Sequence, residues 1–178
     1  LKVQLLQIRE RELEFYVRNT LTICVVATII LGFSYTMMTE AVPSDYAGVG
    51  PYAVRVLYMV SCMSSLGFMF VSLISTTLLS MLAPGLALRG PDGAMHPAVD
   101  GMIDEYRQAF YAFLGGLLFF HGMAALAGWV HFHHLALSAD EGWEYYFLSG
   151  VLSALVCVSL FNLVRAIRRI FFTFALPE

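Results

Sequence analysis

The sequence predicts an all-α membrane protein whose single domain, residues 1–178, crosses the bilayer four times. Two observations support this prediction. The 178 residues are 59% hydrophobic and only 13% charged, with a mean hydropathy of +0.74, whereas soluble domains carry about 25% charged residues. In addition, the charged residues leave four gaps that can each hold the roughly 20 apolar residues of a transmembrane helix. A soluble globular domain and a disordered chain are thereby excluded.

The four gaps define the spans in chain order. The first gap lies between Arg18 and Glu40, and the second lies in the long uncharged stretch between Arg55 and Arg89. Two further apolar runs follow in the second half of the chain. The predicted spans are residues 19–39, 56–82, 110–130 and 146–164.

Composition and charge assign the segments between the spans. Residues 1–18 contain strong helix formers and no Pro or Gly, so we expect the first helix to continue through them. Pro84 is expected to end the second helix, and residues 83–109 then form a loop with a charged lead-in to the third span. Residues 1–18, the segment 83–109 and the tail 165–178 lie on one side of the membrane in a four-span chain, and this side holds nine of the ten Lys and Arg residues. Only Arg55 falls on the other side. The positive-inside rule therefore predicts that both termini are cytoplasmic.

Charge and cysteine usage exclude other classes of protein. The net charge of −3 and the absence of a basic face argue against a nucleic-acid partner. The three cysteines, Cys24, Cys62 and Cys157, lie in apolar runs, where a thiol usually packs as a small hydrophobe. We find no nucleophile–base pair and no paired intramembrane carboxylates, so neither an enzyme nor a bound cofactor is expected.

One face of the first span carries the residues that suggest a function. Successive members are three or four residues apart, so they share one side of a helix. From the outer end inward, this stripe consists of Glu40, Thr36, Phe33, Ile29, Val25, Thr22 and Arg18. The stripe has a carboxylate at its outer mouth, a hydroxyl one turn below, an apolar section, and a cation at its inner end.

Several copies of this helix around one axis would bring the Glu40 carboxylates into a ring. Such rings are the filters of cation channels, and Ca²⁺ accepts six to eight oxygen ligands in flexible geometry. Phe33 and Ile29 would then form an apolar gate that excludes water. The alternative is that Glu40 is an interfacial residue just outside the bilayer, where a carboxylate has little cost.

Three segments resemble the Orai calcium channels. The segment GFSYTMMTE, Gly32 to Glu40, resembles their first transmembrane helix, in which Gly-Phe and six further residues precede the selectivity glutamate. The segment LISTTLL, Leu73 to Leu79, is similar to the family's Leu-Met-Ile-Ser-Thr run. Trp129, Val130 and Phe132 resemble its Trp-Val-Lys-Phe ending of the third span.

The resemblance implies a calcium-selective homohexamer in the plasma membrane, with the first helix of each subunit around the pore. It implies that Glu40 is the filter and that Thr36, Phe33 and Ile29 line the apolar section. Three features depart from the family pattern. Val25 stands where the family has a basic residue, Asp45 is the only acid of the first outer loop, and Phe68 and Met123 replace a functional His and Glu.

Histidines provide two further candidate sites. His121 lies within the third span, where an ionisable residue is a functional candidate: it could ligate haem or chlorophyll or relay protons. It could equally be hydrogen-bonded to a neighbouring helix. His131 and His134 share a helix face that could bind a divalent transition metal, or could form a solvated interfacial rim.

The competing function is a non-conducting structural subunit. In that case the chain fills space between larger membrane subunits of a respiratory or photosynthetic assembly in an organelle, and His121 contacts a haem or pigment. The lost basic inner pore and the single acid of the outer loop favour this alternative. The two hypotheses differ in whether Glu40 faces copies of itself or faces lipid and other subunits.

Overall fold

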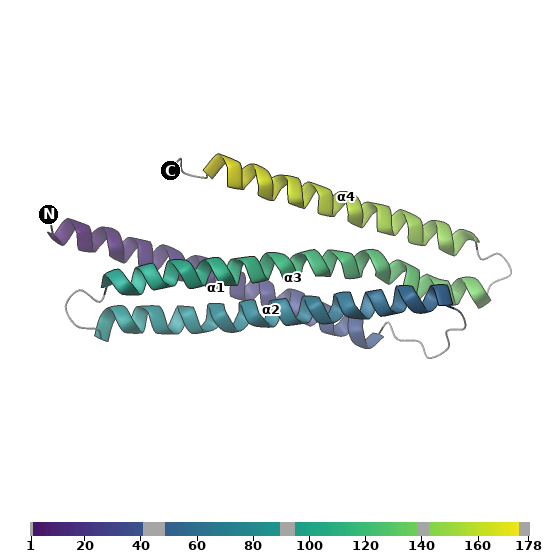
Figure 1. The fold of residues 1–178 in the computed structure, drawn as a ribbon, viewed down its shortest axis with the longest axis horizontal. Coiled ribbons are helices and arrows are strands. Elements are labelled where there is room, and N and C mark those ends of the chain that lie inside the picture. Colours follow the sequence, from purple (N-terminus) through teal and green to yellow (C-terminus); the bar gives the residue numbers. More distant parts are fainter. Residues whose placement is uncertain (1, 41–48, 90–94, 139–142, 175–178) are drawn as a thin grey trace. The chain divides into compact units, whose positions relative to one another are not determined.

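The computed structural model describes residues 2–40, 49–89, 95–138 and 143–174 (Figure 1). They form four helices: α1 (Lys2–Glu40), α2 (Val49–Arg89), α3 (Met95–Ser138) and α4 (Trp143–Phe174). Every residue in these ranges is helical, which confirms the all-α fold class. Some side chains near the helix ends, including those of Glu40 and His134, lie outside the description.

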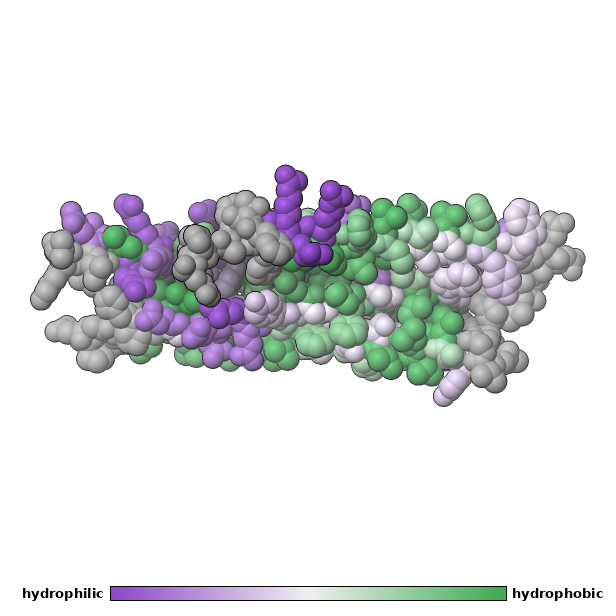
Figure 2. All heavy atoms as spheres, turned by 45° about the horizontal axis from the view of Figure 1, so that its top comes forward, coloured by the Kyte–Doolittle hydropathy of each residue, from purple (hydrophilic) through white to green (hydrophobic). Residues whose placement is uncertain are grey.

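All four helices are long and apolar enough to cross a membrane. The candidate spans are Gln7–Thr39, Tyr52–Leu86, Val99–His131 and Trp143–Arg169, with 33, 35, 33 and 27 residues. Each of them contains one of the four spans predicted from the sequence, so the prediction of a four-span protein is confirmed at the level of helix length and composition. Figure 2 shows that many hydrophobic side chains lie at the surface rather than inside, as expected for a chain solvated by lipid.

The helix boundaries differ from the prediction around the second span. α2 continues through Pro84 to Arg89, and α3 begins at Met95, so the prediction of a loop over residues 83–109 is wrong at both of its ends. Proline removes one helical hydrogen bond, here the one to the carbonyl of Ser80. The segment from Leu86 to Leu88 contains strong helix formers that carry the helix onward. The predicted helical extension over residues 1–18 is confirmed from Lys2 onward.

The first of two compact units joins α1 up to Tyr35, α2 from Ser64, and α3 up to Leu117. Its buried side chains recur at intervals of seven residues, the repeat of helices that pack nearly parallel to one another. On α1 they are Thr20, Ile23, Ala27, Ile30 and Ser34; on α2 they include Ser65, Met69, Ser72, Thr76 and Ala83; on α3 they include Val99, Met102 and Ala109. Many of these residues are small, so the helices of this unit can approach closely.

The second unit contains residues 36–63 and 118–178. Its core is a cluster of four buried side chains, Tyr58 and Cys62 of α2 with Met123 and Val130 of α3. Met38, from the end of α1, packs against this cluster. All three cysteines are free thiols, and of these only Cys62 is buried.

Hydroxyl groups attach α4 to α3 within the second unit. Ser149 donates a hydrogen bond to the carbonyl of Gly128 at 3.1 Å, and Ser153 donates to the carbonyl of Ala125 at 2.7 Å. The indole nitrogen of Trp129 donates to the hydroxyl of Ser153 at 2.7 Å. Ser149 is the only buried side chain among those described on α4, so these polar contacts carry much of its attachment.

We expect the double substitution Ser149→Ala and Ser153→Ala to loosen α4. It removes three hydrogen bonds, and each is worth about 0.6 kcal/mol in a membrane bundle, so the free energy of unfolding should fall by about 2 kcal/mol. The measurement is reversible unfolding in mixed detergent micelles. Ser159→Ala is the matched control, because Ser159 is exposed on the same helix. An equal loss of stability in both proteins would contradict the assignment.

Candidate functional site

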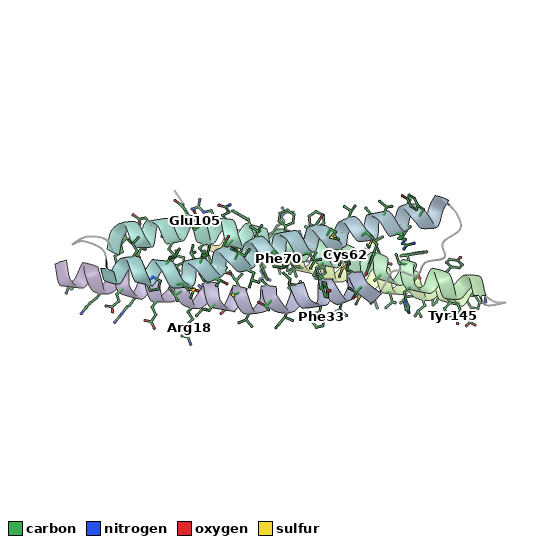
Figure 3. All side chains as sticks on the ribbon, turned by 90° about the horizontal axis from the view of Figure 1, so that it is seen from below. Arg18, Phe33, Cys62, Phe70, Glu105 and Tyr145 are labelled. Carbon is green, nitrogen blue, oxygen red and sulfur yellow. The ribbon has the colours of Figure 1, made fainter. Side chains whose placement is uncertain are left out.

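The stripe predicted from the sequence lies on the exposed face of α1. Val25 is 60% exposed, Ile29 53% and Phe33 57%. Arg18, Thr22 and Thr36 are exposed as well. Glu40 is the last residue of α1, and its side chain lies outside the described residues. In Figure 3, Arg18 and Phe33 project from the same side of α1, away from α2.

The opposite side of α1 packs inside the first unit. Ile23, Ala27, Ile30 and Ser34 are buried there. α1 therefore has one face that packs against its own chain and another face that the described residues leave exposed. The exposed face is available to lipid, to further copies of the chain, or to another subunit.

The exposed face is apolar even where it carries hydroxyl groups. Thr22 donates its hydroxyl hydrogen to the carbonyl of Arg18 at 3.1 Å, and Thr28 donates to the carbonyl of Cys24 at 2.8 Å. These bonds within the helix satisfy the hydroxyl donors. The surface between Arg18 and Phe33 is consequently dominated by methyl groups and the phenyl ring.

On its buried side, α1 is connected to α2 and α3 by a series of hydrogen bonds. The hydroxyl oxygens of Ser34 on α1 and Ser65 on α2 are 3.1 Å apart, and Ser65 donates to the carbonyl of Gly116 on α3 at 3.2 Å. Ser34 and Ser65 are both fully buried. These hydrogen bonds fix the rotation of α1 within the first unit, since turning the helix would break a buried polar contact.

The N-terminal part of α1 is attached to α3 by an ion pair and by aromatic contacts. Arg9 lies 3.0 Å from Glu12 of its own helix and 3.6 Å from Asp100 of α3. The rings of Tyr16 and Tyr106 meet edge to face with centroids 5.5 Å apart. These contacts hold the predicted extension of α1 as part of the first unit.

The histidine candidates belong to the part of α3 that lies in the second unit. His121 is partly buried in α3, and its ring meets that of Phe120 edge to face at 6.2 Å. His131 is exposed, and the side chain of His134 lies outside the described residues. Among the side chains that the structure describes, no group of three or more His, Cys, Asp or Glu could hold a metal ion. Metal binding at His131 and His134, and haem or pigment binding at His121, stay predictions.

Sequence reasoning missed the residues that hold α1 in place. A seven-residue repeat of small residues, Thr20, Ala27 and Ser34, was present as a signal for the packed face. No sequence signal pairs Ser65 with Gly116, because the contact depends on the relative height of two helices that are distant in the chain.

The four membrane-length helices place the chain in the class of multi-pass integral membrane proteins. No family model matches it, and no curated protein and no solved structure matches it. A functional assignment therefore depends on the site described above.

Proposed function

We propose that the chain is a subunit of an Orai-like calcium-selective channel in which the α1 helices of several copies surround the pore. One observation carries the proposal. Val25, Ile29 and Phe33, which the helical spacing assigns to the pore, lie on the face of α1 that its own chain leaves exposed. A pore helix needs this arrangement, because its supporting helices must pack on one side and leave the other side to the conduction path.

Ion selection would take place at the outer end of α1. Glu40 is the last residue of that helix, so a ring of α1 helices brings one carboxylate per subunit to the same height. Carboxylate oxygens replace the hydration shell of a hard cation, and Ca²⁺ tolerates the irregular geometry of such a ring. The expected filter is therefore a ring of Glu40 side chains.

The gate would be the apolar section below the filter. Phe33, Ile29 and Val25 present hydrocarbon over three turns, and a narrow hydrocarbon constriction excludes water and ions by dewetting. Arg18 lies at the inner end of the stripe and would face the inner mouth. Thr36 would lie between the filter and the gate.

We expect Ile29→Ser to raise the basal cation flux of the closed channel, because a hydroxyl group in the constriction favours water there. The measurement is calcium uptake by proteoliposomes without any activating treatment. Leu155→Ser is the matched control, since Leu155 is an equally large aliphatic side chain that is 62% exposed but lies on α4 and not on the stripe. Equal flux through both variants would contradict the gate assignment.

The number of subunits follows from the resemblance of Gly32–Glu40 to the first Orai helix, which favours six copies in a plasma membrane. The inner pore should differ from that of the family, because Val25 stands where a basic residue is expected. The proposed partners are the lipid bilayer and further copies of this chain.

The proposal is tested by stoichiometry and flux measured on one preparation. Native mass spectrometry of the complex in detergent should give a homohexamer, and the same complex in liposomes should admit calcium in preference to sodium. A single copy bound to unrelated proteins, together with liposomes impermeable to calcium, would overturn it.

One observation favours the alternative of a non-conducting structural subunit. α4 exposes large apolar side chains along its length, with Phe147 67%, Leu155 62% and Phe161 67% exposed. Such a surface suits packing against larger membrane subunits as well as lipid. The same mass-spectrometric experiment distinguishes the two functions, because this alternative requires unrelated partner chains.

A further inference from the structure

A tyrosine of α2 holds the last turn of α1. The hydroxyl group of Tyr58 donates a hydrogen bond to the carbonyl oxygen of Met37 at 2.8 Å. Both residues belong to the second unit. Met37 lies three residues before Glu40, where α1 ends. A carbonyl oxygen has two lone pairs, so it can accept this hydroxyl in addition to a backbone N–H group.

The ring of Tyr58 cannot shift without disturbing the core of the second unit. Tyr58 is fully buried and packs with Cys62, Met123 and Val130. Met38, the neighbour of Met37, packs against the same cluster. The end of α1 is therefore held twice, by an apolar contact through Met38 and by a directed hydrogen bond through Met37.

A phenylalanine would fill the same space at lower cost. A buried hydroxyl group is expensive unless it is hydrogen-bonded, and this one bonds both to the backbone of α1 and to the thiol of Cys62 on its own helix. The bond to Met37 is the one that links the hydroxyl group to the end of α1. Helix ends fray when nothing holds them, because their terminal backbone groups lack partners within the helix.

We propose that Tyr58 is a positioning residue for the ion filter: its bond to Met37 fixes the last turn of α1 and thereby the backbone that carries Glu40. This inference rests on the proposed function, in which Glu40 forms the filter. A ring of carboxylates binds Ca²⁺ at about 2.3–2.6 Å from each oxygen. Loose helix ends spread these oxygens and weaken the preference for calcium.

The test is Tyr58→Phe, which removes the hydroxyl group and keeps the ring. Two quantities are measured on the assembled protein: hydrogen exchange of the peptide that contains residues 37–40, and the permeability ratio of calcium to sodium in liposomes. We expect exchange at the end of α1 to rise roughly three- to fifteenfold, the factor that corresponds to one interhelical hydrogen bond in a membrane bundle. The permeability ratio is expected to fall, while the number of subunits and the melting temperature change little.

Tyr52→Phe is the matched control. Tyr52 lies on the same helix and is 65% exposed, so the loss of its hydroxyl group should leave both measurements unchanged. A structural role alone would lower the melting temperature without changing the permeability ratio of the channels that remain assembled.

The outcomes separate the two proposals. Faster exchange with an unchanged permeability ratio, or no change in either, would overturn the positioning role and leave the channel intact. Absence of calcium flux through the wild-type protein would overturn the proposed function and the positioning role with it. Faster exchange together with a reduced ratio in Tyr58→Phe, and neither in Tyr52→Phe, is the supporting result.

Discussion

Glu40→Gln is expected to abolish calcium-selective current while the protein still folds and assembles. The substitution keeps the shape of the side chain and removes its charge, so a ring of amides loses the attraction that dehydrates Ca²⁺. Sodium would then pass as readily as calcium, or neither ion would pass. The measurement is the reversal potential under opposed calcium and sodium gradients, with calcium uptake by proteoliposomes recorded in parallel.

Glu144→Gln is the control for this experiment. Glu144 is exposed in the first turn of α4, and the succession of four spans puts it on the same side of the membrane as Glu40. Its neutralisation changes the charge on that side without altering α1. If both variants kept the wild-type reversal potential, Glu40 would be an interfacial residue and not a filter.

Gly116→Leu is expected to destabilise the first unit by overpacking its core. A Cβ atom at Gly116 would lie 2.9 Å from Met69 Cε and 3.0 Å from Met69 Cγ. The remaining atoms of a leucine side chain would have to displace Met69, which is fully buried. The same displacement would disturb the hydrogen bond from Ser65 to the carbonyl of Gly116. Overpacking of this kind costs roughly 1–3 kcal/mol.

Gly67→Leu provides the matched comparison for Gly116→Leu. Nothing lies within 4 Å of a Cβ atom at Gly67, so the larger side chain has room. Reversible unfolding of both variants in mixed micelles measures the difference. Gly116→Ala should lie between wild type and Gly116→Leu, because its single added carbon requires Met69 Cγ, Sδ and Cε to give way only slightly. Equal stability of the two leucine variants would show that Gly116 is not a close-packing position.

The fold could be predicted from the sequence because length and apolarity dictate it. Each of the four apolar runs lies inside one observed helix, since a chain in lipid must satisfy its backbone hydrogen bonds within the helix. The end of α2 could not be predicted from Pro84, because a proline weakens a helix locally and the residues after it decide whether another turn forms.

The side of α1 that carries the stripe could be predicted from the sequence, whereas the role of these residues stays a prediction. Helical periodicity places Val25, Ile29 and Phe33 on one side of α1, and that side is the exposed one. The spacing along a single helix is written in the sequence, whereas the relative height of two helices is not. For this reason the bond from Tyr58 to Met37 and the contact of Ser34 with Ser65 emerge only from the packed structure.

The seven-residue repeat in the first unit limits how α1 can move. The packed face of α1 carries Thr20, Ala27 and Ser34, and its exposed face carries Ile29 and Phe33. A twist of α1 about its own axis would carry larger side chains towards the positions that the small Thr20, Ala27 and Ser34 side chains occupy. A tilt or a small axial slide keeps the same residues facing inward. Movement of this helix within the first unit is therefore expected to occur by bending, tilting and translation rather than by rotation about its axis.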